Sequence, residues 1–464
     1  MSINITPRRV PRGQLERAVS FGGLALRLGS NVAKSALKEL GQGRKPDARK
    51  LLLTISNIET TTDTLARMRG AAMKLGQLFS MDDLDIVAPE FSKILSRLRA
   101  QGYSMPPQQL RKILDQRWGK GWLSKFSQFD VRPFAAASIG QVHKAVTKDG
   151  RVLAVKVQFP NIKDTIASDI KNLRFLIKAS GFLPQGLDLE HYLGACKTQL
   201  MQEADYAREA DFLRRFNKIS CSTHDIKVPE LIEEFSNDSI LCMSYELGQD
   251  IDRADMYSQT ECKKIGRLMI DWTLKEIFDF QLLQSDPNFA NYRFDTKAAQ
   301  LILLDFGATV EIPDAIVSIY KSLIDAVLNN DKQALLTQLH TYHLLPENVP
   351  NNLQHLIGSI LSTALKEFHA SEEFSFAESE IFDFVTPENM ANLSRLTPTH
   401  LIPTELLLVQ RKLVGMVFLL RGLGVALPLK KMIQQQVNKQ FKKHPKKPDL
   451  RSITLSRNKR LYCP

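Results

Sequence analysis

At 464 residues the chain exceeds one typical domain, and its 44% hydrophobic and 24% charged residues are ordinary for a globular protein with two or three cores. Five widely spaced cysteines, with no CxxC or Cys/His cluster, argue against a disulfide framework or a zinc site and favour a reducing compartment. The net charge is +12, of which residues 1–50 carry +8 and residues 430–464 carry +10, so the residues between them carry −6. A nucleic-acid enzyme would have a basic working face, and this acidic middle part argues against one.

The first 110 residues predict an α-helical extension. Apolar residues recur at helical spacing over residues 10–40, with glycines that divide the segment into two helices, and further helical patterns cover residues 50–79, 89–98 and 107–117. The first residues are rich in arginine, as organelle presequences are, but they lack the apolar core of a secretory signal peptide. Because this segment is short and leads directly into a folded pattern, we expect a bacterial source.

From residue 131 the pattern changes to short β-rich runs and helices. Strands are predicted at residues 152–157, 239–245 and 301–307, and helices at residues 164–179, 189–216 and 259–280. Beyond Pro313 the chain has a helical pattern to about residue 440. The most apolar late stretch, residues 416–429, is interrupted by Arg421 and falls short of the ~20 apolar residues that span a bilayer, so we predict no transmembrane helix.

The strand predicted at residues 152–157 carries a lysine near its end. LAVK, which ends at Lys156, matches the VAIK strand of protein kinases, whose lysine pairs with ATP phosphates. Upstream, the kinase loop pattern GxGxxGxV falls on Ala135, Ala137, Gly140 and Val142. Small residues keep side chains away from phosphates while backbone N–H groups can still donate, although alanine has a narrower choice of backbone angles than glycine.

Two further motifs carry oxygen ligands. In QSDPNFANY, Asp286 and Asn291 have the five-residue offset of the kinase catalytic loop, and Asp305 opens a DFG triplet after an apolar strand. Mg²⁺ prefers oxygen ligands, usually one or two from the protein together with phosphates, and Asn291 and Asp305 supply such a pair.

Four motifs in kinase order, each on the expected element, predict an α+β fold: a bilobal protein-kinase-like fold with an N-terminal helical extension and a mostly helical C-lobe. We predict the extension at residues 1–110, the N-lobe at 111–247, the C-lobe at 248–430 and a basic tail at 431–464.

The sequence resembles the UbiB-type atypical kinase-like family, the AarF/ADCK proteins, and within it the branch that supports coenzyme Q synthesis. The resemblance rests on KLGQ at residues 74–77, which matches a KxGQ signature, and on FAAASIGQVHKA, QEADYAREA and QSDPNFANY. It covers about residues 10–430 and leaves out the basic tail.

The resemblance implies roles for particular residues. An alanine-rich loop replaces the glycine loop and still binds nucleotide; Ser138 and Lys156 contact it, and residues 243–246 form the hinge beside the adenine. Asp286 is then the catalytic-loop acid, and Glu209 pairs with Lys156. The implied ATP-binding residues are Ala135, Ala136, Ala137, Ser138, Lys156, Glu209, Met243, Ser244, Tyr245, Glu246, Asn291 and Asp305.

The resemblance also implies regulatory residues outside ordinary kinases. Lys74 and Gln77 share one helix face, and in the family this helix packs across the cleft where a kinase admits a peptide. Glu203 and Asp205 match the family's ExD element beside the nucleotide. Gln284-Ser285 replaces the usual His-Arg, so an activation-loop phosphate would have no arginine partner there.

The function expected from these motifs is an Mg²⁺-ATP-dependent ATPase that supports ubiquinone (coenzyme Q) biosynthesis from the inner face of a membrane, in the cytoplasm or the mitochondrial matrix. The basic ends suit anionic membrane lipids, although a solvated tail explains the charge equally well. Coenzyme Q precursors and biosynthesis enzymes are further expected partners, and nucleic acid is not. The alternatives are a small-molecule or lipid phosphotransferase and a non-catalytic nucleotide-sensing scaffold.

Overall fold

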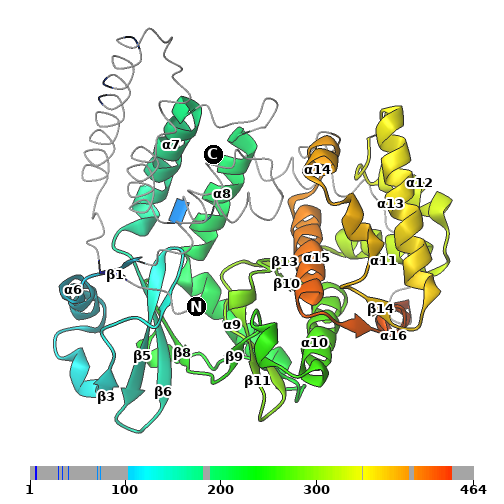
Figure 1. Cartoon of the computed structure of the whole chain (residues 1–464). Helices are drawn as coiled ribbons and strands as arrows, with labels where there is room; N and C mark the ends of the chain where they lie inside the picture. The colour runs from blue at the N-terminus through cyan, green and yellow to red at the C-terminus, as the bar shows by residue number, and fades with distance from the viewer. Residues whose placement is uncertain are drawn as a thin grey trace. The chain divides into compact units, whose positions relative to one another are not determined.

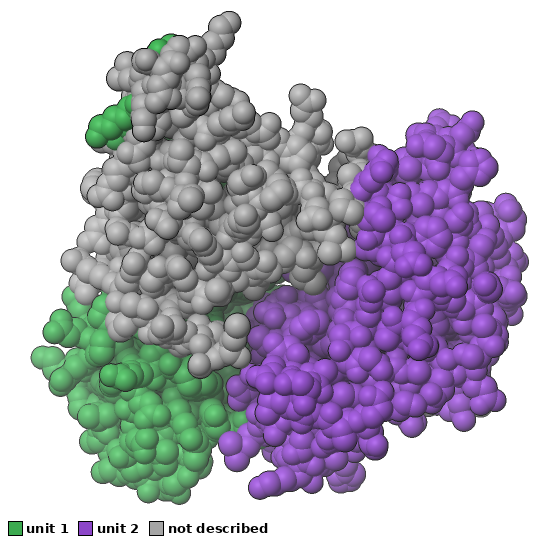
Figure 2. Space-filling view, viewed as in Figure 1, with its two compact units in different colours: residues 1–217, 229–246 green, residues 218–228, 247–464 purple. Residues whose placement is uncertain are grey.

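The computed structural model describes residues 103–180, 189–346, 348–394, 396 and 402–441, together with residues 6–7, 30, 34, 40, 70–71 and 74. The chain divides into two compact units, coloured separately in Figure 2, with a boundary between Glu246 and Leu247. Unit 1 holds the described residues up to 217 and residues 229–246; unit 2 holds residues 218–228 and those from 247 onward. The limits predicted for the four domains remain predictions. Gln77, most of the predicted helical extension and residues 442–464 of the basic tail lie outside the described residues.

Unit 1 is built on an antiparallel sheet in which β3, β5, β6 and β8 lie in that order and β4 also pairs with β5. β5 and β6 form the long hairpin in Figure 1, with Val142 opposite Lys156. The hairpin turn contains Gly150 at φ +85°, a left-handed conformation that glycine adopts without strain. The strands are β3 (Phe126–Phe129), β4 (Ala135–Ala136), β5 (Gly140–Thr147), β6 (Val152–Gln158) and β8 (Ile240–Ser244).

An aromatic cluster fills the core beneath one end of this sheet. Trp118 stacks on Phe126 at 5.4 Å, and Trp122, Phe129 and Phe235 pack around them. Such rings supply much of a small core's buried apolar surface. The short β1 (Thr6–Pro7) pairs with β2 (Tyr103–Ser104). From residue 103 onward, α-helices and 3-10 turns complete the described part of unit 1, with α7 and α8 side by side. They are α6 (Pro107–Trp118), η1 (Trp122–Lys125), α7 (Ile162–Ser180), α8 (Leu189–Glu203), α9 (Tyr206–Ser220) and η2 (Glu233–Phe235).

The single helix predicted at residues 189–216 is wrong: the chain forms two helices that break at Ala204-Asp205. Asp205 Oδ1 accepts the backbone N–H of Arg208 at 3.2 Å, as an N-cap side chain does at the start of a helix. The side chain of Gln158, from β6, donates to the buried carbonyl of Ala204 at 2.7 Å. Helix α8 therefore ends at Glu203, and α9 starts at Tyr206, so that Glu209 lies in the first turn of α9.

Unit 2 begins with two small sheets. One has the order β7-β12-β11-β9, and the other is the antiparallel pair β10-β13. Helix α10 starts with a capping box in which Ser258 and Glu261 satisfy each other's backbone N–H groups. The elements are β7 (Ile226–Lys227), β9 (Gln249–Asp250), η3 (Ala254–Met256), α10 (Gln259–Phe278), β10 (Leu282–Gln284), η4 (Phe289–Asn291), β11 (Tyr292–Asp295), β12 (Gln300–Leu303) and β13 (Thr309–Glu311).

The remainder of unit 2 is mainly helical, as predicted for the chain beyond Pro313, with one short antiparallel pair, β14-β15, that the pattern did not predict. Within the described residues, no helix is long and apolar enough to cross a membrane. The elements are α11 (Asp314–Leu328), α12 (Lys332–Thr341), α13 (Asn351–Ala370), β14 (Phe374–Ser375), η5 (Glu380–Phe384), α14 (Pro387–Ser394), α15 (Thr404–Gly422), β15 (Ala426–Leu427) and α16 (Leu429–Phe441).

Candidate active site

The alanine-rich segment forms a tight turn at the edge of the sheet of unit 1. Ala135 and Ala136 make up β4 and pair with β5, and the backbone N–H of Ala137 donates to the carbonyl of Gly140 at 3.0 Å. Ser138 and Ile139 therefore form the tip of a short hairpin. Ordinary strand pairing positions this loop without any need for glycine at the first two positions of the kinase pattern.

Gly140, the one glycine kept from that pattern, is required by close packing. A Cβ at this position would lie 2.5 Å from the carbonyl oxygen of Val157 and 2.9 Å from the hydroxyl of Tyr206. Because real Cβ atoms do not approach backbone oxygen so closely, a larger residue would displace the start of β5. Glycine is therefore needed at the start of β5, where the chain packs against β6 and the first residue of α9.

Lys156 and Glu209 form a buried ion pair in unit 1. Lys156 Nζ lies 2.7 Å and 3.0 Å from the two carboxylate oxygens of Glu209, and the Glu209 side chain is fully buried. The ring of Tyr206 lies 5.3 Å from the same ammonium. A charge-assisted pair of this geometry fixes both side chains. The lysine is thereby held within β6, where the kinase pattern predicts contact with phosphates.

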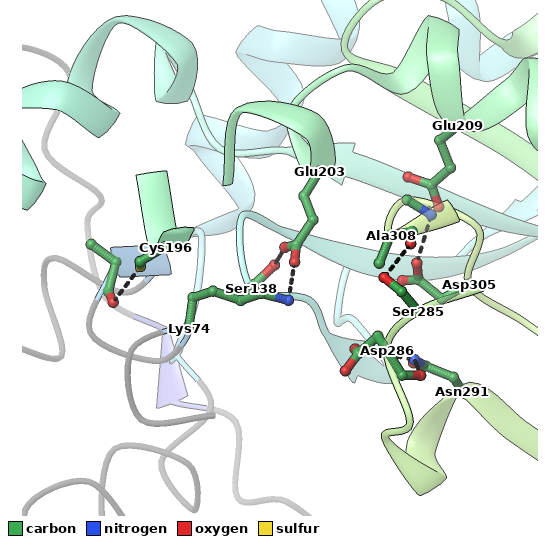
Figure 3. A network of polar contacts seen from close by, with 12 residues as sticks. Lys74, Ser138, Cys196, Glu203, Glu209, Ser285, Asp286, Asn291, Asp305 and Ala308 are labelled. Carbon is green, nitrogen blue, oxygen red and sulfur yellow. Dashed lines mark hydrogen bonds and ion pairs between the residues drawn. The ribbon is translucent and has the colours of Figure 1, made fainter. Parts of the chain in front are cut away.

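Glu203 joins the tip of the alanine loop to the KxGQ lysine (Figure 3). One carboxylate oxygen accepts the hydroxyl of Ser138, and the other lies 2.5 Å from Nζ of Lys74, whose side chain is only 1% exposed. The predicted regulatory residues Lys74 and Glu203 are therefore direct partners. In this arrangement the Ser138 hydroxyl is bound to Glu203, and its contact with nucleotide remains a prediction.

A thiol lies beside this pair. Cys196 Sγ donates to the carbonyl of Ala71 at 3.6 Å, and burial raises the pKa of Cys196 to about 12 (Figure 3). The nearby ammonium of Lys74 opposes this shift without reversing it. A thiol in that state is protonated and inert at neutral pH.

Residues 243–246, which were predicted as the hinge, are the last residues of unit 1. Met243 is buried in β8, and Ser244 donates its hydroxyl to Glu246. The ring of Tyr245 packs edge-on against Phe134 at 5.5 Å, and its backbone N–H donates to Val152. The chain passes from unit 1 to unit 2 directly after Glu246.

In unit 2, strand pairing brings the two remaining motifs together. β10 and β13 pair so that Gln284 lies opposite Thr309, and Ser285 next in the chain donates both its N–H and its hydroxyl to Ala308 (Figure 3). β11 and β12 pair so that Leu304 N–H donates to the carbonyl of Asn291 at 2.9 Å. The QSDPNFAN loop therefore lies against the DFG segment.

Asp286 and Asn291 are hydrogen-bonded within their loop. Asn291 Nδ2 donates to Asp286 Oδ2 at 3.2 Å, so the amide oxygen of Asn291 is the atom left to act as a ligand (Figure 3). Asp305 accepts the N–H of Gly307 at 2.9 Å with Oδ1. An amide oxygen and a carboxylate at neighbouring strand ends are donors of the type that Mg²⁺ takes, so these residues fit the predicted metal.

Two basic residues on α15 complete this loop, and motif reasoning missed both. Arg411 Nη2 lies 3.8 Å from Asp286 Oδ1. The buried Lys412 donates to Gln284 Oε1 at 3.1 Å and to the hydroxyl of Tyr292. The signal was present in the sequence, since Arg-Lys interrupts a helix whose other residues are mostly apolar. A buried cation needs a partner, and here the partners lie at both ends of the candidate catalytic loop.

A buried carboxylate faces Lys412 from α10. Glu276 Oε2 lies 3.8 Å from Lys412 Nζ, and Glu276 Oε1 accepts the indole N–H of Trp272 at 3.0 Å. Burial raises the pKa of Glu276 to about 7, against the attraction of Lys412. Burial alone would lower the pKa of Lys412, but Tyr292 and Glu276 raise it above its usual value. The lysine is therefore charged at neutral pH.

These observations define a protein-kinase-like chain: a strand lysine bound to a helix glutamate in unit 1, and an Asp-x4-Asn loop against a DFG segment in unit 2. The chain belongs to the ABC1 atypical kinase-like family, whose domain model matches residues 97–339. Its relatives place it with the UbiB/AarF/ADCK-type proteins of the coenzyme Q branch.

The curated relatives include two yeast proteins. The chain is 33% identical to "Atypical kinase COQ8, mitochondrial" of Schizosaccharomyces pombe over 92% of this chain and 70% of that one. It is 31% identical to the COQ8 protein of Saccharomyces cerevisiae over 92% of this chain and 85% of that one. Both relatives are mitochondrial by name, so they give no support to the bacterial source expected from the short N-terminus.

A solved structure supports the same fold. The Rv3197–erythromycin complex from Mycobacterium tuberculosis matches with a TM-score of 0.59 and 22% identity, over 87% of this chain and 98% of that one. At this identity the match concerns the fold alone. The bilobal α+β kinase-like class predicted from the motifs is confirmed.

Proposed function

We propose that the chain is an Mg²⁺-ATP-dependent ATPase that supports coenzyme Q biosynthesis at a membrane. The observation that carries the proposal is the buried Lys156–Glu209 pair, with both carboxylate oxygens within 3.0 Å of the ammonium. In kinase-like proteins this pair holds the lysine for the nucleotide phosphates. The names of the COQ8 relatives support the link to coenzyme Q.

Unit 1 supplies the groups that would bind the nucleotide. Lys156 would pair with phosphate oxygens, and backbone N–H groups of the alanine loop would donate to them. Residues 243–246 would face the adenine. Glu203 holds Ser138 and Lys74 in one network, so a change at the loop tip would be felt by the KxGQ lysine.

Unit 2 supplies the groups for the transfer itself. Asn291 and Asp305 would hold Mg²⁺, which neutralises charge on the phosphates when bound. Asp286 would orient a water molecule and take its proton as the new O–P bond forms. The bond from the γ-phosphorus to the bridging oxygen then breaks, and ADP leaves with the electron pair. Arg411 would hold the Asp286 carboxylate in place.

Attachment to a membrane is proposed from charge. The basic segments at the two ends of the chain would attract anionic lipids by about 1 kcal/mol for each well-placed side chain. Coenzyme Q precursors and the enzymes of that biosynthesis are the proposed partners. Deleting residues 442–464 is expected to weaken binding to anionic vesicles in a salt-sensitive way.

The proposal is tested by phosphate release from Mg²⁺-ATP, measured with and without anionic liposomes. Asp286→Asn and Asp305→Asn should abolish release, whereas Asp252→Asn, the same change at an exposed position of unit 2, should leave it unchanged. No release by the unaltered chain, with nucleotide binding intact, would favour the nucleotide-sensing scaffold. Labelled phosphate recovered on an organic acceptor would favour the phosphotransferase.

A further inference from the structure

A cavity of about 940 Å³ lies within unit 2, between α12, α13, the connection that joins them and η5. Its volume is in the range of small-molecule sites, roughly 300–1,000 Å³. Neither the candidate catalytic loop nor the DFG segment lines it. The function proposed above therefore leaves this cavity unused.

Part of the cavity lining is apolar. Leu336, Leu345, Val349, Ile357 and Phe384 line it, and the first four belong to a small hydrophobic cluster separate from the main core. Leu336 and Leu345 are only partly buried. A ligand with a hydrocarbon portion would remove this surface from water, at about 25 cal/mol for each Å².

The lining also carries a cation. Lys332 Nζ donates to the carbonyl of Gly358 at 2.9 Å and to the hydroxyl of Ser362 at 2.7 Å, both neutral acceptors. Among the described residues that line the cavity there is no aspartate or glutamate. The lining thus has a positive charge with neutral partners, which complements an anion.

Further polar groups line the cavity. They include His340, His355 and the hydroxyl-bearing side chains of α13, of which Ser362 accepts the hydrogen bond of Lys332. Hydroxyl groups can donate to an anion held beside the ammonium.

Gly358 also indicates a ligand site. It lies inside α13, where glycine is less stable than alanine. A Cβ built there would meet only Lys332 Nζ, at 3.7 Å, which is ordinary contact. Neither backbone angle nor packing therefore requires glycine. What its missing side chain leaves is open space beside the ammonium group.

We propose that this cavity binds a single-chain amphiphile with one anionic head group, of the fatty-acid class. The head group pairs with Lys332, beside the hydroxyl of Ser362. The hydrocarbon chain covers Ile357 and the leucines of the lining. This site is independent of nucleotide binding, so its test does not depend on ATP turnover.

The experiment measures saturable binding of 11-(dansylamino)undecanoic acid to the full chain by fluorescence and its displacement by laurate or dodecanol. Laurate should displace the probe, and dodecanol, which lacks the charge, should be about tenfold weaker. Lys332→Gln should weaken laurate binding by a similar factor. Gly358→Leu should abolish it, because the new side chain fills the space beside Lys332.

Lys366→Gln serves as the matched control, since Lys366 is an exposed lysine on the same helix and does not line the cavity. It should leave binding unchanged, and circular dichroism should show all three variants folded. Absence of saturable binding, or equal binding by Lys332→Gln and Gly358→Leu, would overturn the proposal. So would displacement of the probe by anionic and neutral vesicles alike, which would indicate a surface for bilayers.

Discussion

The guanidinium of Arg411 lies 3.8 Å from Oδ1 of Asp286, so a helix near the end of unit 2 contacts the loop that carries the candidate catalytic acid. Both side chains are largely buried, at 11% and 15% exposure. The next residue, Lys412, reaches Gln284 and Tyr292, which lie on either side of the same loop. Helix α15 therefore contacts the candidate catalytic loop at both of its ends.

Replacing Arg411 with methionine is expected to lower kcat for ATP hydrolysis by about tenfold or more, because a mispositioned acid loses part of its contribution to proton transfer. KM for ATP should change little, since Lys156 and the alanine loop are untouched. Steady-state kinetics over a range of ATP concentrations checks both parts.

Two variants control this result. Arg411→Lys keeps the charge and should recover part of kcat, whereas Arg267→Met removes an exposed arginine of unit 2 and should have no effect. A fall in kcat that matches the loss of folded protein in the same preparation, with no recovery by lysine, would mean that the residue acts only through general stability.

Lys412→Met is expected to destabilise unit 2 by roughly 3–5 kcal/mol, because it leaves Glu276 buried without its opposite charge. Glu276→Gln alone should also destabilise, since Lys412 then lacks its carboxylate. The double variant should cost less than the sum of the two single changes. Urea unfolding of the four proteins measures this coupling. Strict additivity would mean that the 3.8 Å pair contributes nothing.

Sequence motifs could predict the parts of the site that ordinary kinases share. The spacing of LAVK, DxxxxN and DFG is enough to nominate Lys156, Asp286, Asn291 and Asp305, because phosphoryl transfer fixes the types and order of these groups. The pairing of Lys156 with Glu209 was expected from the family resemblance, and the structure contains it. These are local signals on elements with strong periodicity.

The remaining contacts depend on tertiary packing that no local pattern encodes. The direct pair of Lys74 with Glu203 joins segments far apart in the chain, and a kinase comparison offers no counterpart. Arg411 and Lys412 could be suspected only as charges in an apolar helix. The helix break at Ala204-Asp205 was missed because the helical periodicity continues through it, while Asp205 as N-cap was the available sign.

His143 is expected to make the protein less stable in acid. Burial lowers the pKa of His143 to about 4, and Gln141 and the carbonyl of Asp130 hold its neutral ring. In the unfolded chain the imidazole takes its proton near pH 6.5, so between pH 6.5 and 4 the unfolded state binds more protons. This contribution, at most about 3 kcal/mol, is present above pH 6.5 and lost as the pH falls to 4.

The measurement is the free energy of unfolding from pH 7 to pH 4. His143→Gln should lower stability at pH 7 and flatten its decline toward pH 4, while His224→Gln, at an exposed histidine, should leave the curve unchanged. An equally steep decline in His143→Gln would assign the acid sensitivity to other groups.

Glu203→Gln is expected to destabilise unit 1 by roughly 3 kcal/mol, since it removes the carboxylate charge that lies 2.5 Å from the buried ammonium of Lys74. Glu190→Gln, on the same helix, removes an exposed carboxylate from two surface pairs and should cost less than about 1 kcal/mol. Thermal unfolding compares the two.

Cys196 gives a local readout of the same change. In the unaltered chain its thiol is buried and should react with iodoacetamide only after unfolding, whereas the exposed Cys221 should react at once. Glu203→Gln should raise the labelling rate of Cys196, followed by peptide mass spectrometry. Unchanged labelling together with unchanged stability would show that the Lys74–Glu203 pair does not hold this region.

Gly140→Ala tests whether the alanine loop depends on its one glycine. The added Cβ would approach the carbonyl oxygen of Val157 to 2.5 Å, so β5 must shift, at a cost of about 1–3 kcal/mol. Gly194→Ala is the matched control: it lies in α8 with nothing within 4 Å of the new Cβ and should stabilise by about 0.5–1 kcal/mol. Because the shift would move the hairpin tip that carries Ser138, Gly140→Ala should also weaken ATP binding, measured by titration calorimetry. If Gly140→Ala is destabilised but binds ATP with normal affinity, this glycine serves packing and not nucleotide binding. The proposed contact of the loop with phosphate would then depend on its alanines.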